Sequence, residues 1–189
     1  MAYFPMFMDM NDLRVLVVGG GAIAHEKLEK LVDFTKEITV IASELSIESA
    51  SLIQDHCLAC YQRAYKTGDI EGFDIVIVAT DTVELHKAIY EESRGSRILV
   101  NSVDNTEYCD FIFPSYVKKD DLTIAFSTGG ASPAFAKYIR RHFERIIPES
   151  VGAFLQKMKA LRTQMPKGKE RMHYFDQLTE EYFQKEFKS

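Results

Sequence analysis

The first 112 residues alternate short apolar runs with longer segments in which apolar residues recur at helical spacing. The runs are rich in valine and isoleucine, which is typical of strands buried in a parallel sheet. We expect these strands at residues 14–20, 37–43, 59–65, 73–81 and 97–104. Helices are expected between them, at residues 24–34, 44–56 and 83–95. Strands that alternate with helices predict βαβ units, and therefore an α/β fold with a Rossmann-like parallel sheet.

The pattern changes after residue 112. Two apolar runs, at residues 111–117 and 122–127, flank the polar sequence KKDD and predict a β-hairpin. A glycine-rich loop follows and leads into a helix. Ser132 is a suitable N-cap for that helix and Pro133 a suitable first residue.

The end of the chain is predicted to be helical. One helix is expected to start at Pro148 and to be broken at Pro166 and Gly168. The tail beyond it is amphipathic, with an apolar stripe. The members of this stripe are Met172, Phe175, Leu178, Tyr182 and Phe183. The chain is thus expected to comprise a Rossmann-like domain (1–112), a small α+β unit (113–147) and a helical C-terminal domain (148–189).

Composition narrows the class of protein. Apolar residues make up 46% of the chain, which is ordinary for a protein with a packed core. No run approaches the ~20 apolar residues that cross a bilayer, so no membrane partner is expected. Residues 1–10 are apolar without a basic region, which favours a strand or a packing staple over a signal peptide. An odd number of cysteines, three, favours free thiols and a cytoplasmic location.

Charge is distributed unevenly. Residues 1–112 hold nine basic and nineteen acidic side chains, for a net charge of −10, whereas residues 113–189 hold fourteen and nine, for +5. The basic part is expected either to meet an anionic partner or to be a set of solvated helix faces. Its helix at 133–146 carries a cluster of basic side chains, but no recognition helix for nucleic acid is evident.

The sequence Gly19-Gly20-Gly21-Ala22-Ile23-Ala24 matches the pattern G-x-G-x-x-A between a predicted strand and a predicted helix. Gly19 is expected to make the tight turn, and Gly21 to let the backbone approach a pyrophosphate. Ala24 is expected to let the helix pack on the sheet. The N-terminus of the helix supplies unpaired N–H groups to phosphates. The motif therefore predicts a dinucleotide-binding turn.

Further candidates lie where other strands end. Ser43 or Glu44 can reach the adenosine ribose, and no arginine follows that strand to bind a 2′-phosphate, so NAD is favoured over NADP. Thr80 and Asp81 end the fourth strand, where Asp81 is either a helix N-cap or a ligand contact. Asp104 ends the last strand of the domain and can accept a proton beside a nicotinamide, or serve as an ordinary turn residue.

A glycine loop, a pair of cysteines and a histidine are further candidate sites. The loop from Ser127 to Gly130 is expected to present free backbone N–H groups at a helix start, as a second anion site. Cys57 and Cys60 form C-x-x-C, but no second ligand pair accompanies them, so no metal is expected. His25 is interpreted as a residue of the helix surface.

Taken in order and at matching spacings, FPMFMD, VLVVGGGAIAHEK, VNSVDN, FIFPS and STGGASPAFAKYIR resemble the N-terminal part of siroheme synthases, over residues 3–145. That family comprises precorrin-2 dehydrogenases, some of which are also sirohydrochlorin ferrochelatases. The resemblance implies oxidation of precorrin-2 to sirohydrochlorin with NAD⁺. It also implies an intertwined homodimer, with residues 113–147 as a dimerisation unit and an active site in a cleft between lobes.

The resemblance also assigns roles to residues. The aspartate of the N-x-V-D motif, Asp104 here, is implicated in catalysis. Tetrapyrrole contacts fall on Asn101, Ser127, Thr128, Gly129 and Gly130. Cofactor contacts fall on Gly19, Gly21, Ala22, Ile23, Ser43, Glu44, Thr80, Asp81 and Val103. The substrate is a polyanionic macrocycle, which suits a basic lobe beside an acidic cofactor domain.

Two alternatives remain open. Iron insertion can accompany the oxidation, but the chain is short and does not include the methyltransferase extension of fused siroheme synthases, which favours a dehydrogenase alone. A non-enzymatic NAD(H)-binding regulatory dimer would share the glycine turn. Such a regulator would need neither Asp104 at a strand end nor the loop from Ser127 to Gly130.

Overall fold

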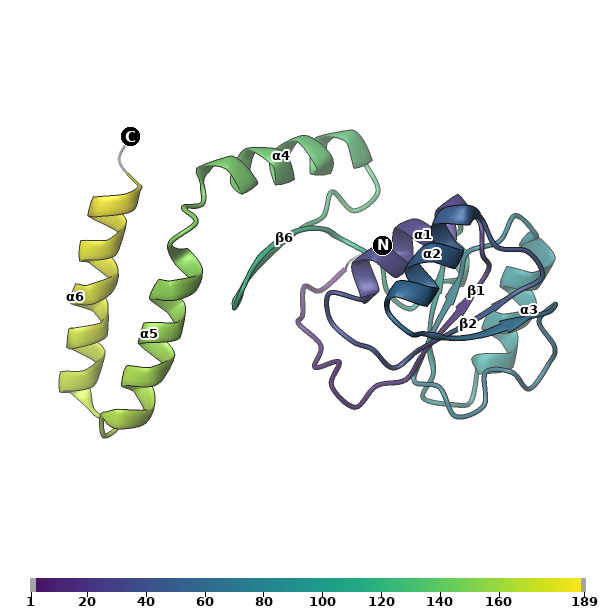
Figure 1. The fold of residues 1–189 in the computed structure, drawn as a ribbon, viewed down its shortest axis with the longest axis horizontal. Helices are drawn as coiled ribbons and strands as arrows, with labels where there is room; N and C mark the ends of the chain where they lie inside the picture. The colour runs from purple at the N-terminus through teal and green to yellow at the C-terminus, as the bar shows by residue number, and fades with distance from the viewer. Residues whose placement is uncertain (1–2, 188–189) are drawn as a thin grey trace. The chain divides into compact units, whose positions relative to one another are not determined.

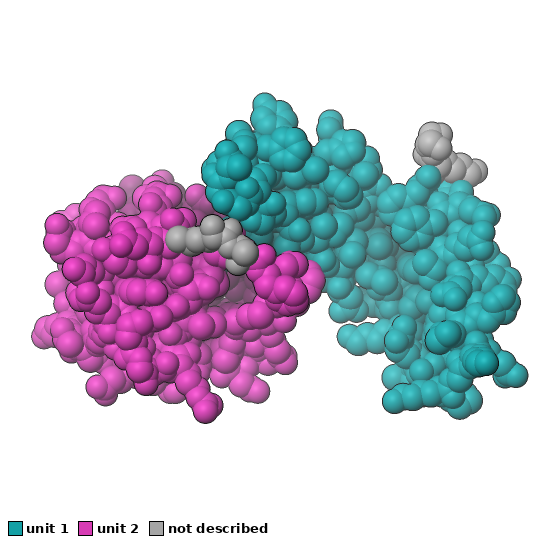
Figure 2. All heavy atoms as spheres, turned by 180° about the vertical axis from the view of Figure 1, so that it is seen from behind, with its two compact units in different colours: residues 1–2, 113–189 teal, residues 3–112 magenta. Residues whose placement is uncertain are grey.

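The computed structural model describes residues 3–187, and the chain forms two compact units. Residues 3–112 form one unit and residues 113–187 form the other (Figure 2). The change of pattern predicted at residue 112 lies at this division. Each unit has its own core and is described by itself.

The unit of residues 3–112 is built on a parallel sheet of five strands (Figure 1). The strands are β1 (Val15–Val18), β2 (Ile38–Ala42), β3 (Ala59–Gln62), β4 (Ile75–Val78) and β5 (Leu99–Ser102). Their order is β3-β2-β1-β4-β5, which matches the first five strands of the doubly wound dinucleotide-binding order 3-2-1-4-5-6. The central strands β1 and β4 are buried at every position, because both faces of the sheet are covered. The predicted fold class is confirmed.

Three helices connect these strands: α1 (Ala22–Leu31), α2 (Ile47–Asp55) and α3 (Val83–Ser93). Ile89 of α3 packs in one cluster with Leu16 and Val18 of β1 and with buried valines of β4 and β5. On α1, Ala24, Leu28 and Leu31 are buried. The second helix starts later than predicted, because the Ser46 side chain accepts a hydrogen bond from the Ser49 backbone N–H at 3.1 Å and caps it.

The N-terminal segment contradicts its prediction. Residues 3–10 form no strand, and residues 1–2 lie outside the described part of the chain. Phe4, Met6 and Phe7 are 85%, 66% and 74% exposed. The strand prediction is therefore wrong, and these three apolar side chains do not pack on the unit to which they belong.

The unit of residues 113–187 begins with the predicted hairpin, formed by β6 (Ser115–Lys119) and β7 (Leu122–Phe126). Helix α4 (Pro133–Ile146) follows and begins as predicted, since Ser132 accepts a hydrogen bond from the Phe135 N–H at 3.1 Å. The chain ends in α5 (Val151–Gln164) and α6 (Lys169–Glu186), with the predicted break between them.

The core of this unit joins the hairpin to the helices. Val117 of β6 is buried with Ile147 and Val151, and side chains of β7, α4 and α5 pack around them. The Asp120 carboxylate lies so close to Gly152 that a Cβ there would sit 1.7 Å from Asp120 Oδ2. Lys119 donates to the Ile147 carbonyl at 2.9 Å. The boundary predicted at 147–148 therefore passes through a packed region.

Two details of the helical end differ from prediction. Helix α5 starts at Val151 rather than Pro148. In α6, Phe175 is buried and Tyr182 stacks on Phe154 with ring centroids 4.1 Å apart, but Met172 and Phe183 are exposed. The apolar stripe is therefore narrower than the sequence suggests. No helix within residues 3–187 is long and apolar enough to span a bilayer.

Candidate functional site

The glycine turn between β1 and α1 is shaped by two close backbone contacts. Gly19 has φ of 126°, and a Cβ there would lie 2.1 Å from the Ala79 carbonyl oxygen. A Cβ on Gly20 would lie 2.3 Å from the Glu44 carbonyl oxygen. Only glycine fits either position, and Gly19 also requires the positive φ. The turn therefore passes directly against the ends of β4 and β2.

Gly21 differs from its neighbours. A Cβ on Gly21 would meet no atom of the described residues within 4 Å. Gly21 is the N-cap of α1, and among residues 3–187 no side chain caps this helix. The first turn of α1 also carries no acidic residue. An uncapped helix start with open space in front of it suits an anion, such as the pyrophosphate of a dinucleotide.

Other predicted residues lie at the same edge of the sheet. Ser43 and Glu44 follow β2 and are exposed. Thr80 follows β4, and its Oγ1 is buried without a hydrogen-bond partner in the described part of the chain. Asp81 is exposed, and the N-cap of α3 is Thr82, so the N-cap interpretation of Asp81 is wrong. The carboxyl edge of β1, β2 and β4 thus gathers residues that fit an extended dinucleotide.

Asp104 lies just beyond β5, in an exposed turn, with φ of 61°. The Cys109 thiol holds this turn, because it lies 3.1 Å from both the backbone N and the carbonyl O of Ser102 and 3.4 Å from the Asn105 carbonyl. Burial raises the pKa of the Cys109 thiol, which keeps it a neutral hydrogen-bonding group. The turn therefore presents the Asp104 carboxylate at the same edge of the sheet as Thr80.

Lys27 is a candidate that the sequence reasoning missed. Its side chain on α1 is only 13% exposed. Burial lowers the pKa of Lys27, with a further lowering by Lys30, whereas the Glu26 and Asp104 carboxylates raise it. The largely buried ammonium group of Lys27 therefore lies close enough to the Asp104 carboxylate to interact with it electrostatically. The signal in the sequence was a lysine within two turns of the glycine motif.

Asn101 in β5 and Val103 just after it are also predicted site residues, and both are less exposed than Asp104. Asn101 is 5% exposed, and its amide donates to the Phe111 carbonyl at 2.8 Å, so it supports the backbone. The contact of Asn101 with a substrate stays a prediction, and its buried amide, already bonded to the Phe111 carbonyl, does not support it. Val103 is partly exposed and extends the ladder by donating its N–H to the Val78 carbonyl at 2.9 Å.

The loop from Ser127 to Gly130 belongs to the other unit. Gly129 and Gly130 both have positive φ, of 60° and 87°. The Gly129 N–H donates to Ser127 Oγ and the Ser132 N–H to Thr128 Oγ1, each at 3.1 Å. The expectation that the N–H groups of the loop are free is therefore wrong for Gly129. Ser127, Gly129 and Gly130 are exposed, so the loop surface is accessible.

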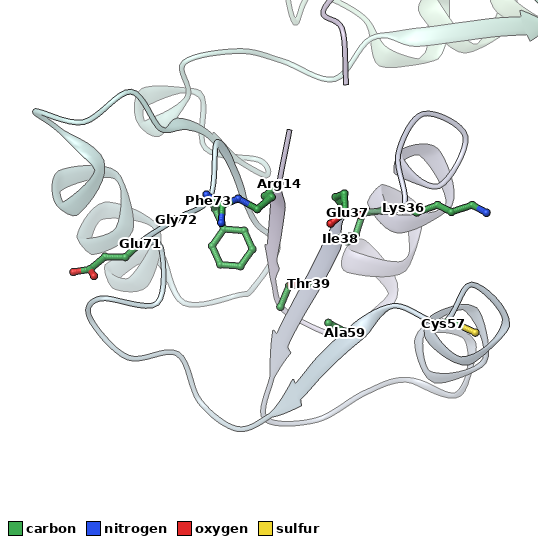
Figure 3. A pocket seen from close by; sticks show the side chains of 10 residues that line it. All are labelled: Arg14, Lys36, Glu37, Ile38, Thr39, Cys57, Ala59, Glu71, Gly72 and Phe73. Carbon is green, nitrogen blue, oxygen red and sulfur yellow. The ribbon is translucent and has the colours of Figure 1, made fainter. Parts of the chain in front are cut away.

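The remaining candidates are two cysteines, one histidine and a cavity. Cys57 and Cys60 are free thiols, and residues 3–187 contain no cluster of side chains suited to a metal ion. His25 is half-buried, and its Nδ1 has no partner among the described residues, so it is not simply a surface residue. A cavity of about 350 Å³ lies at the amino ends of β1 to β3 (Figure 3). Arg14, Lys36 and Phe73 line it, at the edge opposite the glycine turn.

The fold and the carboxyl edge define a dinucleotide-binding protein of the Rossmann class. The chain belongs to the family described as putative NAD(P)-binding, whose model matches residues 6–115. A second model, described as sirohaem biosynthesis protein central, matches residues 119–146. The nicotinamide cofactor class predicted from the sequence is thus confirmed, without distinguishing NAD from NADP.

Comparison with similar proteins indicates a more specific family within the dinucleotide-binding class. The chain is 37% identical over 162 residues to a siroheme synthase of Pseudoalteromonas atlantica, covering 84% of this chain and 35% of the relative. It is 34% identical over 184 residues to that of Methylococcus capsulatus, covering 95% and 39%. It therefore spans little more than a third of these relatives. A solved structure of SirC, precorrin-2 dehydrogenase, superposes with a TM-score of 0.79 and 25% identity, over 94% of this chain and 88% of that one. The resemblance to the siroheme synthase family is confirmed.

The open space at Gly21 leads to a test of the cofactor site. Gly21→Asp is expected to keep or raise the melting temperature, because the N-cap backbone (φ −80°, ψ −168°) suits aspartate. It is expected to abolish NAD⁺ binding, because the carboxylate takes the place of the pyrophosphate. Isothermal titration calorimetry and thermal unfolding measure the two effects.

Gly21→Asn is the matched control, since it caps the helix without adding charge, and it is expected to weaken NAD⁺ binding less. Gly19→Ala is expected to unfold the unit instead, because of the contact with Ala79. If Gly21→Asp bound NAD⁺ with unchanged affinity, the glycine turn would not be the cofactor site.

Proposed function

We propose that this protein oxidises precorrin-2 to sirohydrochlorin with NAD⁺, as a step in siroheme biosynthesis. The observation that carries the proposal is the exposed Asp104 carboxylate at the same sheet edge as the open glycine turn. The similarity to siroheme synthases and to SirC, precorrin-2 dehydrogenase, supports the choice of substrate. The reaction removes a hydride and a proton from the macrocycle, and NAD⁺ accepts the hydride when bound.

The residues of the chain have three tasks in this proposal. Gly21, Ala22 and Ile23 hold the pyrophosphate through the start of α1. Thr80 and Val103 orient the nicotinamide end of the cofactor. Asp104 accepts the proton, directly or through water, and the Lys27 ammonium group is a positive charge that interacts with it. Ser127, Thr128, Gly129 and Gly130 are proposed to contact the carboxylates of the substrate.

NAD⁺ is the proposed cofactor rather than NADP⁺. Glu44 is exposed directly after β2, where a second negative charge would repel a 2′-phosphate, and Ser43 beside it can bind a free ribose hydroxyl. The oxidation assay is therefore run with each cofactor. A higher kcat/KM with NADP⁺ would overturn this choice.

Asp104→Asn tests the proposed catalytic role. Asparagine adopts a positive φ as readily as aspartate, whereas alanine does so at a greater cost, so the turn is expected to survive the substitution by asparagine. The variant is expected to bind NAD⁺ normally and to lose turnover by about a hundredfold or more, because the amide cannot accept the proton. Anaerobic incubation with precorrin-2 and NAD⁺, followed by absorption spectroscopy, measures the oxidation.

The same experiment separates the competing functions. A wild-type protein that binds NAD⁺ but leaves precorrin-2 unchanged would instead be a regulatory NAD(H)-binding protein. Normal turnover by Asp104→Asn would remove Asp104 from the mechanism. Adding Fe²⁺ after the oxidation tests iron insertion, which we do not include in the proposal.

We also propose that the protein is a homodimer that associates through the unit of residues 113–187. Phe135, Tyr138 and Ile146 lie on one face of α4 and are exposed within their unit. Calibrated gel filtration at micromolar concentration is expected to show a dimer, and Tyr138→Glu to shift it toward monomer. The control Lys137→Glu, on a neighbouring exposed position, is expected to stay dimeric. A monomeric wild type would contradict the proposal.

A further inference from the structure

We propose that His86 is a positioning residue that ties the end of β4 to the end of β5 and thereby fixes the Asp104 turn beside the cofactor edge. This inference rests on the proposed function in so far as it concerns catalysis. His86 is a buried residue of α3 and has no part in the proposed transfer of hydride and proton.

The two ring nitrogens of His86 reach the two strand ends. His86 is 3% exposed. Its Nε2 lies 2.8 Å from the Thr80 carbonyl oxygen, and its Nδ1 lies 2.5 Å from Ser102 Oγ. A carbonyl oxygen only accepts, so Nε2 carries the hydrogen and donates it. In the neutral ring Nδ1 then accepts from the Ser102 hydroxyl, and both nitrogens are satisfied inside the unit.

Ser102 is the residue through which His86 acts on the turn. It is the last residue of β5 and is 2% exposed. Its hydroxyl contacts His86, while its backbone N and O both contact the Cys109 thiol. The next residue, Val103, is hydrogen-bonded to Val78, and Asp104 follows in the left-handed conformation. The chain is therefore held from both sides just before it enters the turn.

The bond to Thr80 completes the link. Thr80 follows β4. Its buried hydroxyl has no hydrogen-bond partner among the described residues, which suits a contact with the cofactor. One imidazole thus connects a residue proposed to contact the nicotinamide with the strand that carries Asp104. Displacing a reacting group by about 1 Å can cost a hundredfold in rate, so such a link matters for turnover.

Two conservative substitutions separate the two bonds. The amide of His86→Asn comes close to the position of Nδ1 and can keep the bond to Ser102. The amide of His86→Gln comes close to the position of Nε2 and can keep the bond to the Thr80 carbonyl. Ser102→Ala removes the hydroxyl from the other side. Ser93→Ala is the matched control, because Ser93 is a buried serine of α3 whose hydroxyl donates to the Tyr90 carbonyl and accepts from Arg94, with no hydrogen bond to His86 or Ser102 in the described part of the chain.

Turnover of precorrin-2 with saturating NAD⁺ is the first readout. His86→Gln and Ser102→Ala are expected to lower kcat by about tenfold to a hundredfold with little change in KM for precorrin-2. His86→Asn is expected to lower kcat less than His86→Gln does, because it keeps the Ser102 bond and loses only the bond to the Thr80 carbonyl. Ser93→Ala is expected to lose stability but not kcat. The proposal would be overturned if His86→Gln had the same kcat as the wild type. It would also be overturned if the loss of kcat were fully explained by a smaller fraction of folded protein.

Hydrogen exchange of the backbone amides is the second readout, and it does not depend on turnover. In His86→Gln the amides of Val103 and Asn105 are expected to exchange faster than in the wild type, whereas those of β1 are unchanged. In His86→Asn they are expected to stay more protected than in His86→Gln, because the bond to Ser102 remains. If the wild-type protein did not oxidise precorrin-2, the proposed function would be rejected but the positioning role would not. Hydrogen exchange would still decide whether His86 holds the turn. Unchanged exchange in His86→Gln would reject the positioning role.

Discussion

The close approach of Gly19 to the Ala79 carbonyl is the contact on which the rest of the site depends. With a Cβ at 2.1 Å from that oxygen, no other residue allows β1 to turn into α1 directly against the end of β4. Gly20 makes the same approach to the end of β2. The start of α1 is consequently fixed over the carboxyl edge of the sheet, with its N–H groups and dipole facing open space at Gly21. The proposed pyrophosphate contacts follow from that placement.

The other half of the site is a strained turn supported by its neighbours. A non-glycine residue in the left-handed region costs of the order of 1–3 kcal/mol, and Asp104 adopts it at φ of 61°. The Cys109 thiol, the ladder bond from Val103 and the His86–Ser102 contact offset this cost. Because these supports are buried or half-buried while the Asp104 carboxylate is exposed, the turn is held in place from within the unit. Lys27 adds a nearby positive charge that suits an ionised carboxylate.

The sequence predicted the sheet because its signals there are local. Valine-rich runs and a glycine motif at a strand end determine β1, β4 and the turn with little help from distant residues. The sequence could not reveal the contacts of His86, Cys109 or Lys27, since each depends on residues brought together by the parallel sheet. It also misjudged residues 3–10 and the stripe of α6, where apolar side chains stay exposed within their units. Periodicity identifies which residues are apolar but not what covers them.

The carboxyl edge also illustrates why a cavity alone does not identify a site. The hollow at the amino ends of β1 to β3 is lined by Arg14 and Phe73, yet it lacks the helix start and the open glycine of the opposite edge. A crystal structure with NAD⁺ bound compares the two edges directly. The account predicts pyrophosphate oxygens against the N–H groups of Ala22 and Ile23, with the nicotinamide beside Val103 and Asp104. NAD⁺ bound in the cavity at Arg14 and Phe73, or a nicotinamide remote from Asp104, would contradict it.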